Sequence, residues 1–173
     1  MTANERPILQ IVGYKNSGKT TLLCALISRF RAEGFTVAAV KRDAHDEFAF
    51  DHPGTDTRKM ADAGADFVAV TSPYRTAWTS NRPARLDELI GFAADADLVL
   101  VEGFKDAPHP KLVLLRGEAD LPLLGLPNAA AAIAPRGRVP AEAGMPVYSR
   151  DDVDGIFAFA RSLLLRAIKQ NRK

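Results

Sequence analysis

The sequence is poor in cysteine, in long hydrophobic runs and in net charge, and each shortage excludes a class of protein. Cys24 is the only cysteine among 173 residues, so no internal disulfide can form and a reducing compartment is expected. It lies among apolar residues of a predicted helix, where burial is expected. No apolar run approaches the roughly 20 residues of a membrane-spanning helix, and the first ten residues lack a signal-peptide pattern. A soluble cytoplasmic protein without membrane association is therefore expected.

The charges nearly cancel: 23 Lys and Arg residues face 21 Asp and Glu residues, for a net charge of +2. Because the two signs are interleaved along the chain, no extended basic surface for nucleic acid is predicted. The length is typical of one domain with a sizeable core, so residues 1–173 are expected to form a single domain.

Short apolar runs alternate with helical patterns, which is typical of an α/β domain with a mostly parallel central sheet flanked by helices. Strands are predicted at 7–13, 35–42 and 97–103, and at "KLVLL", "AAAAIA" and "PVYS". Helices are predicted at about 19–33, from Thr55 or Asp56 to Ala63, near 85–94, and after Asp151 and Asp152. An apolar stripe on the last helix predicts packing against the sheet.

The segment "ADFVAVTSPYRTAWTS" predicts two strands about a turn at Ser72-Pro73. It carries three aromatic residues, Phe67, Tyr74 and Trp78. Aromatic side chains in such strands either cover the core or enter a subunit interface, and a core position is expected here.

One loop follows the first predicted strand and fits the pattern G-x-x-x-x-G-K-[ST] as "GYKNSGKT". Gly13 and Gly18 permit backbone conformations closed to residues with a Cβ, so successive amides can point at phosphate oxygens. Lys19 places a cation against the terminal phosphates, and Thr20 offers a hydroxyl to Mg²⁺. The following helix adds the positive end of its dipole. A chance match in an ordinary turn is the alternative, but the strand before the loop and the helix after it favour nucleotide binding.

The loop therefore predicts a P-loop NTPase fold that binds a nucleoside triphosphate with Mg²⁺, and Lys19 is also a candidate catalytic residue. Nucleotide contacts are expected from the loop and the start of the helix, at Gly13, Tyr14, Lys15, Asn16, Ser17, Gly18, Lys19, Thr20 and Thr21. Lys15 could also supply a cation at the transition state, although exposure to solvent is the plainer interpretation.

Acidic residues near strand ends are candidates for the metal. Glu102 ends an apolar strand where its carboxylate would meet the loop, so it is expected to bind Mg²⁺, directly or through water, and to act in catalysis. Gly103 would let the backbone approach the terminal phosphate. Asp43 follows the second strand and is a further candidate catalytic residue that would hold metal-bound water, because ligands collect outside the carboxyl ends of parallel strands. Asp97 lies at the other end of its strand and is expected to be structural.

Three stretches together resemble the molybdopterin-guanine dinucleotide biosynthesis protein B family: "GYKNSGKTTL", "VAAVKRDAHDEFAFDHPGTDTRKMADAGA" and "LVLVEGFKDAPHPKLVL". The resemblance covers most of the chain up to about Arg116. It implies a P-loop protein that binds GTP with Mg²⁺, hydrolyses it slowly at most, and forms a dimer. It also implies a partner, the guanylyltransferase that attaches GMP to molybdopterin.

Carried over position by position, the resemblance matches the phosphate loop at residues 13–20, and further family positions at Lys41, Glu102, Gly103, Lys105 and Lys111. Arg42 stands where many relatives have histidine, and the loop "HDEFAFDHPG" is about a residue longer than usual.

Two functions remain open at this point. In the first, GTP with Mg²⁺ orders the loops after the second strand and after Glu102, and the ordered surface recruits the transferase or its pterin substrate. In the second, a small-molecule kinase passes the γ-phosphoryl group to an anionic acceptor held by His45 and by the lysines of "KRDAHDEF" and "GFKDAPHPK". The same phosphate loop serves both functions, so enzymatic activity beyond a weak GTPase is left open.

Guanine selectivity cannot be read from the residues, because no N-K-x-D segment is present; Asn128 or the backbone near "AAAAIAPRG" is the candidate base contact. His45, Asp46, Asp51 and His52 lack the cysteines or the helical spacing of a zinc site, so they are expected to be solvated or to contact substrate.

Overall fold

The structure, a computed structural model, describes residues 6–43, 51–136 and 144–170. The chain divides into two compact units, one made of Met1–Arg42 and Leu86–Lys173, the other of Asp43–Arg85. The single domain expected from the length stays a prediction. None of the helices in the described ranges is both long enough and apolar enough to span a bilayer.

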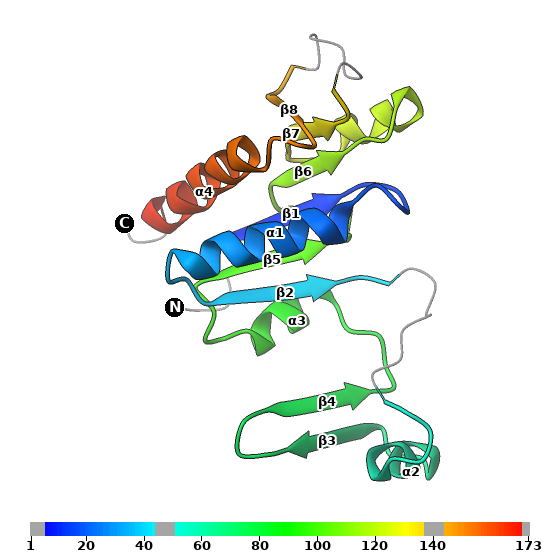
Figure 1. The fold of residues 1–173 in the computed structure, drawn as a ribbon. Helices are drawn as coiled ribbons and strands as arrows, with labels where there is room; N and C mark the ends of the chain where they lie inside the picture. Colours follow the sequence, from blue (N-terminus) through cyan, green and yellow to red (C-terminus); the bar gives the residue numbers. More distant parts are fainter. Residues whose placement is uncertain (1–5, 44–50, 137–143, 171–173) are drawn as a thin grey trace. The chain divides into compact units, whose positions relative to one another are not determined.

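A six-stranded sheet forms the centre of the first unit, and all of its neighbouring strands are parallel (Figure 1). The strand order is β2-β5-β1-β6-β7-β8. The strands are β1 (Ile8–Val12), β2 (Val37–Lys41), β5 (Leu98–Glu102), β6 (Lys111–Leu114), β7 (Ala129–Ala134) and β8 (Val147–Ser149). The predicted α/β fold and the six predicted strands of this unit are confirmed.

Helices cover both faces of this sheet. They are α1 (Lys19–Ala32), α3 (Leu86–Phe92), α4 (Val153–Gln170) and the 3-10 helix η2 (Glu118–Gly125). Side chains alternate along β5, so Leu98 and Leu100 join the core under α1 and α4, while Val99 and Val101 join the core under α3. Every residue of β5 is buried, as its unbroken apolar sequence predicts.

The C-terminal helix α4 packs on the sheet as its apolar stripe predicts. Ile156, Ala160 and Leu164 are buried in the core that α4 shares with α1. Asp152 precedes the helix, and its Oδ1 accepts a hydrogen bond from the amide of Gly155 at 2.9 Å. One of the two candidate caps is thereby confirmed.

One local expectation is wrong, and one helix was not predicted. Cys24 is exposed rather than buried, because α1 turns Leu22, Leu23 and Leu26 toward the core and Cys24 away from it. The helix η2 was not predicted, because its segment contains Pro122 and lacks a helical apolar period.

The second unit contains α2 (Asp56–Asp62) and an antiparallel hairpin of β3 (Phe67–Thr71) and β4 (Thr76–Ser80). Thr55 caps α2 by accepting a hydrogen bond from the amide of Arg58 at 3.2 Å. Both the predicted cap and the predicted pair of strands are confirmed.

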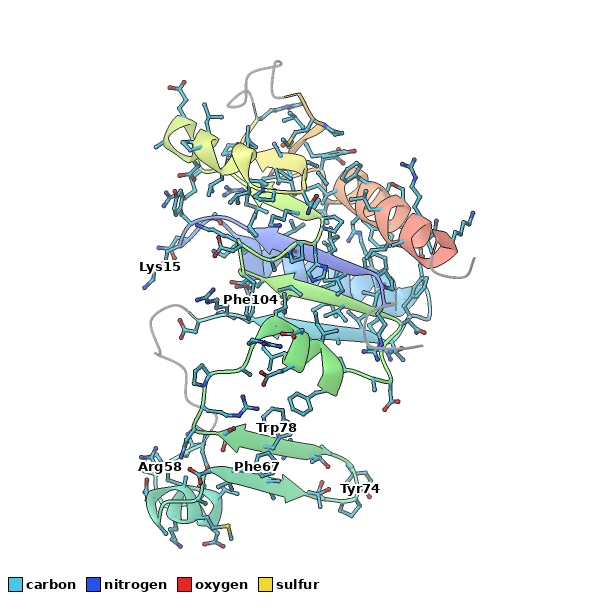
Figure 2. The ribbon with its side chains drawn as sticks, turned by 180° about the vertical axis from the view of Figure 1, so that it is seen from behind. Lys15, Arg58, Phe67, Tyr74, Trp78 and Phe104 are labelled. Atoms are coloured by element: carbon cyan, nitrogen blue, oxygen red, sulfur yellow. The ribbon has the colours of Figure 1, made fainter. Side chains whose placement is uncertain are left out.

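The aromatic residues of this hairpin are not core residues, so that expectation is wrong. Phe67, Tyr74 and Trp78 are 59%, 95% and 38% exposed. Figure 2 shows Tyr74 at the turn of the hairpin, whereas the rings of Phe67 and Trp78 stack with their centroids 5.8 Å apart. Because side chains alternate in a strand, Phe67 lies on the face opposite Val68, which is buried. The subunit interface stays a prediction.

The connection from β5 to β6 crosses β1, and the buried ammonium of Lys111 holds it. Lys111 has no exposed surface, and its Nζ lies 2.5 Å from the carbonyl oxygen of Ala107, 3.0 Å from that of His109 and 2.8 Å from that of Pro127. An ammonium group has three protons, so these three carbonyls use all of them. Burial lowers the pKa of Lys111. Lys111 therefore cannot hold an anionic acceptor, as the kinase interpretation requires.

Lys111→Met tests this structural role, because methionine keeps an unbranched apolar side chain but donates no hydrogen bond. We expect the free energy of unfolding to fall by about 2 to 4 kcal/mol, since buried carbonyls lose their donor. Urea denaturation followed by circular dichroism measures the change. The matched control is Lys169→Met in the exposed last turn of α4, where a change within about 0.5 kcal/mol is expected. Equal effects of the two substitutions would contradict the assigned role.

Candidate phosphate-binding site

The glycine loop joins the carboxyl end of β1 to the amino end of α1. Asn16 and Gly18 are both in the left-handed region, with φ of 62° and 90°. Such residues turn neighbouring amides toward one side and create a concavity that suits an anion. Gly18 precedes α1 and supplies no side-chain cap, and the first turn of α1 contains no acidic residue. The amino end of α1 is therefore suited to an anionic ligand.

Gly13 is required for space rather than for its backbone angle, which corrects the reason given by the sequence. A Cβ on Gly13 would lie 2.5 Å from Oγ of Ser17 and 2.8 Å from the carbonyl oxygen of Leu114. Any larger residue would thus separate the loop from β6. Ser17, within the loop, is fully buried, and its Oγ has no partner within the described part of the chain. Contact with a phosphate through the Ser17 hydroxyl stays a prediction.

Lys19 lies among charged groups at the start of α1. Its Nζ donates a hydrogen bond across the loop to the carbonyl oxygen of Tyr14, at 2.8 Å. Burial lowers the pKa of Lys19, the carboxylate of Glu102 opposes this change, and the cations Lys105 and Lys41 lower the pKa further. A carboxylate and additional cations therefore lie close enough to act on this ammonium.

Thr20 and Glu102 meet at the edge of the loop. Glu102 ends β5, is only 5% exposed, and its Oε2 accepts a hydrogen bond from the Thr20 hydroxyl at 2.8 Å. The structure thus brings together the two residues expected to bind the metal. Mg²⁺ prefers oxygen ligands and keeps several waters, so a hydroxyl beside a carboxylate fits this ion. The two residues leave further coordination positions for phosphate oxygens.

Gly103 has a different role from the one expected. Its amide donates to the carbonyl oxygen of Ile11 at 3.0 Å and continues the pairing of β5 with β1. Its φ is 90°, a left-handed value, and a Cβ would lie 3.3 Å from that of Arg42. A glycine is needed here to turn the chain next to Arg42, and its amide is already used within the sheet.

Arg116 and Asp120 support the phosphate loop from β6, and sequence reasoning missed both. Asp120 is 1% exposed and accepts hydrogen bonds from the backbone amide, Nε and Nη2 of Arg116, at 2.8 to 2.9 Å. Nη1 of Arg116 donates to the carbonyl oxygen of Lys15 at 3.3 Å, and the guanidinium lies 5.3 Å from the ring centroid of Tyr14. The sequence feature that could have indicated Arg116 is its position just after a predicted strand, where ligand-binding residues of parallel sheets gather.

The Arg116 guanidinium lowers the pKa of Asp120 to about 2, mainly by hydrogen bonding. Because this pKa lies below the ordinary value of 3.8, the stabilisation is complete above about pH 4 and is lost as the pH falls toward 2. We expect Asp120→Asn to lower the free energy of unfolding by about 1 to 3 kcal/mol at pH 7 and by progressively less between pH 4 and pH 2. Denaturant titrations across this range measure the difference. Glu118→Gln, at an exposed position of the same helix, is the control, and a pH-independent effect of Asp120→Asn would refute the pairing.

The remaining loop candidates lie at the surface of the site. Tyr14, Lys15 and Asn16 are exposed on the loop, and Thr21 is exposed in the first turn of α1. Asp43 is half-buried two residues after β2, and its role with metal-bound water stays a prediction.

Asn128 is not at this edge of the sheet, so of the two candidate base contacts the one at Asn128 is wrong. It precedes β7, at the amino end of the strand, and its Nδ2 donates to the carbonyl oxygen of Pro108 at 3.0 Å. In a parallel sheet the amino ends of the strands lie opposite the edge that carries the phosphate loop. The segment that follows residue 136 lies outside the described residues.

Asp97 and Asp51 both have structural partners away from the phosphate loop. Asp97 lies at the amino end of β5, where its carboxylate accepts from the amide and hydroxyl of Thr36, which confirms the structural role predicted for it. Asp51 accepts from the Thr55 hydroxyl and the His52 amide near the start of α2, and the hydrogen bond from Thr55 lowers the pKa of Asp51. The other two members of that acidic and histidine group lie outside the described residues: His45 and Asp46.

A parallel sheet with central β1, a glycine loop leading into α1, and an acidic strand end beside that loop define a protein of the P-loop NTPase fold. The family model described as "Molybdopterin guanine dinucleotide synthesis protein B" matches residues 8–134. The chain belongs to this family, called MobB, which confirms the resemblance seen in the motifs.

Curated relatives and solved structures agree with this assignment. A probable molybdopterin-guanine dinucleotide biosynthesis adapter protein from Bacillus subtilis is 36% identical over 151 residues, covering 84% of this chain and 87% of the relative. The corresponding adapter protein from Escherichia coli is 32% identical over 159 residues, covering 88% and 90%. A crystal structure of Bacillus subtilis MobB has a TM-score of 0.80 at 31% identity and covers 91% of this chain and 98% of that one. A MobB homologue from Bacillus stearothermophilus has a TM-score of 0.73 at 33% identity and covers 92% and 98%.

Proposed function

We propose that this chain binds GTP with Mg²⁺ in the loop between β1 and α1 and acts as an adapter in the biosynthesis of molybdopterin guanine dinucleotide. The observation that carries the proposal is the 2.8 Å contact between the Thr20 hydroxyl and the buried carboxylate of Glu102, beside the loop. Membership of the MobB family and the names of the adapter relatives support the pathway.

Different residues of the site would bind the phosphates and the Mg²⁺ ion. The uncapped amino end of α1 and the Lys19 ammonium would hold the phosphates. Thr20 and Glu102 would hold Mg²⁺, which when bound neutralises part of the phosphate charge. The packing of Gly13 against Leu114 fixes the loop to β6, so its shape is set before any ligand arrives.

Hydrolysis by this site would be slow. Fast phosphoryl transfer requires a group that orients the attacking water, together with strong stabilisation of the developing charge. Glu102 is engaged by Thr20 and would serve the metal, so it is poorly placed to orient water as well. The site is therefore better suited to holding GTP than to consuming it, as expected of a binding protein.

The adapter role needs a partner, for which the guanylyltransferase that attaches GMP to molybdopterin is proposed. The preference for GTP over ATP and the homodimer are proposed on the family resemblance, and the cytoplasmic location stays a prediction from the sequence. In this view the nucleotide-bound surface recruits the transferase or presents the nucleotide to it.

Calorimetric titration of GTP and ATP, each with and without Mg²⁺, tests the nucleotide site. We expect the wild-type chain to bind GTP more tightly with Mg²⁺ than without it. Lys19→Ala should weaken GTP binding by about 10- to 100-fold, because a charged contact to phosphate is lost. Thr20→Val and Glu102→Gln keep similar volumes and should remove most of the dependence on Mg²⁺. Lys169→Ala, in the exposed last turn of α4, is the matched control.

The outcomes of this titration separate two levels of the proposal. Equal affinity for ATP and GTP would remove the guanine assignment and leave the phosphate site intact. No detectable affinity for any nucleoside triphosphate would refute the proposal itself.

Reconstituted dinucleotide synthesis tests the adapter role. Addition of this chain to the guanylyltransferase, molybdopterin and GTP with Mg²⁺ should raise the rate of product formation, whereas the Lys19→Ala variant should not. The chain alone should release little phosphate from GTP. Rapid transfer of the γ-phosphoryl group to an added anionic acceptor would instead identify the chain as a kinase.

A further inference from the structure

The turn that follows β5 has an unusual backbone. Gly103 and Phe104 are consecutive and both left-handed, with φ of 90° and 53°. Glycine adopts this region freely, but a bulky residue such as Phe104 is strained there. Strain of this kind persists only where the surrounding structure imposes it, and it gathers at functional sites.

The side chain of Gln10, on β1, holds the backbone of this turn by hydrogen bonds. Its side chain is fully buried in β1, and Nε2 donates to the carbonyl oxygens of Gly103 and Phe104 at 2.9 and 2.7 Å. Its Oε1 accepts from the amide of His109 at 3.3 Å, farther along the same crossing segment. The Phe104 ring packs on the core that contains Val99 and Val101. The turn is thus held by hydrogen bonds on its backbone and by packing on its side chain.

This turn brings Lys105 to the phosphate loop. The Lys105 ammonium is 4.1 Å from the ring centroid of Tyr14, the second residue of that loop. Tyr14 also provides the carbonyl that binds Lys19, so two ammonium groups contact the same loop residue. Lys105 follows Glu102 by three residues and therefore reaches the loop from the side that carries the metal-binding pair.

The negative charge of a bound triphosphate would be stabilised by a further cation such as Lys105. A fully ionised triphosphate carries about four negative charges, so with Mg²⁺, Glu102 and Lys19 the site retains about two. Arg116 lies on the other side of β1, and Asp120 compensates its charge. Within the described residues, the direct contact of the Lys105 ammonium is with an aromatic ring, and at longer range its charge also helps to lower the pKa of Asp120.

We propose that Lys105 is a further phosphate-binding residue that contacts the terminal phosphate of the bound nucleoside triphosphate, and that Gln10 positions it through the left-handed turn. The inference rests on the proposed nucleotide binding. Thr20 and Glu102 mark the Mg²⁺ end of the triphosphate, so a cation arriving from β5 meets the terminal phosphate rather than the first. Lys105 would thereby distinguish a triphosphate from a diphosphate.

Titrations of GTP and GDP, both with Mg²⁺, test the contact in Lys105→Ala and Lys105→Arg. We expect Lys105→Ala to weaken GTP binding by about 10- to 100-fold and GDP binding by no more than about threefold, because only GTP carries the terminal phosphate. Lys105→Arg keeps the positive charge and should restore most of the preference for GTP. Lys169→Ala, a lysine change remote from the loop, should leave both affinities unchanged.

Gln10→Glu tests the positioning role, because it replaces the amide donor with an acceptor of similar shape. We expect it to reduce the preference for GTP over GDP, and the double variant with Lys105→Ala to show no further reduction. Such coupling would not arise from a general loss of stability, which thermal unfolding of each variant measures separately. Where Gln10→Glu fails to fold, the Lys105 variants decide the inference alone.

The possible results separate this inference from the proposed function. If wild type binds GTP but Lys105→Ala alters GTP and GDP equally, or alters neither, Lys105 does not contact the terminal phosphate. If Lys105→Ala leaves GTP binding intact but abolishes binding of inorganic phosphate to the GTP-loaded chain, Lys105 holds an acceptor anion instead, and the inference is overturned. Failure of the wild type to bind any nucleotide would refute the proposed function as well.

Discussion

The crossing from β5 to β6 over β1 is the constraint on which the site depends. These two strands lie on either side of β1, so the carboxyl end of one has to be joined across β1 to the amino end of the other. Gln10 and Lys111, both fully buried, bind the backbone of the crossing segment. Apolar residues at these positions would leave buried carbonyls without donors. Because the crossing is fixed, Glu102 and Lys105 at its beginning are fixed beside the phosphate loop.

The cations around the loop converge on one residue, yet they are not equivalent. The carbonyl oxygen of Tyr14 accepts a hydrogen bond from Lys19, and the Lys105 and Arg116 cations lie over the Tyr14 ring. Arg116 is bound by a buried aspartate, so its main effect is to hold the loop in place from β6. Lys105 carries an ammonium on the β5 side, where Glu102 also lies. The β5 side of the loop is therefore suited to phosphate and metal chemistry, and the β6 side to support of the loop.

The sequence is sufficient for features that depend on neighbouring residues. The glycine spacing locates the loop between β1 and α1, and the charge at the end of an apolar strand locates Glu102 beside it. It is not sufficient for the Arg116–Asp120 pair, which depends on β6 lying next to β1. Gly13 shows the same limit. Its spacing in the loop is recognisable from the sequence, but the need for glycine there comes from the close approach of a carbonyl oxygen of β6. The exposed hairpin aromatics show that hydrophobicity predicts burial only where enough structure is present to cover the side chain.

The energetics of the turn at Phe104 explain why it can exist without help from a ligand. Its left-handed backbone costs about 1 to 3 kcal/mol. The two hydrogen bonds from Gln10 contribute about 0.5 to 1.5 kcal/mol each, and burial of part of an aromatic ring contributes a similar amount again. These contributions match or exceed the strain, so the folded chain holds Lys105 in place by itself. A phosphate that meets an ordered cation loses less conformational entropy on binding. The position of Lys105 beside the loop therefore depends on Gln10, which holds the backbone of the turn.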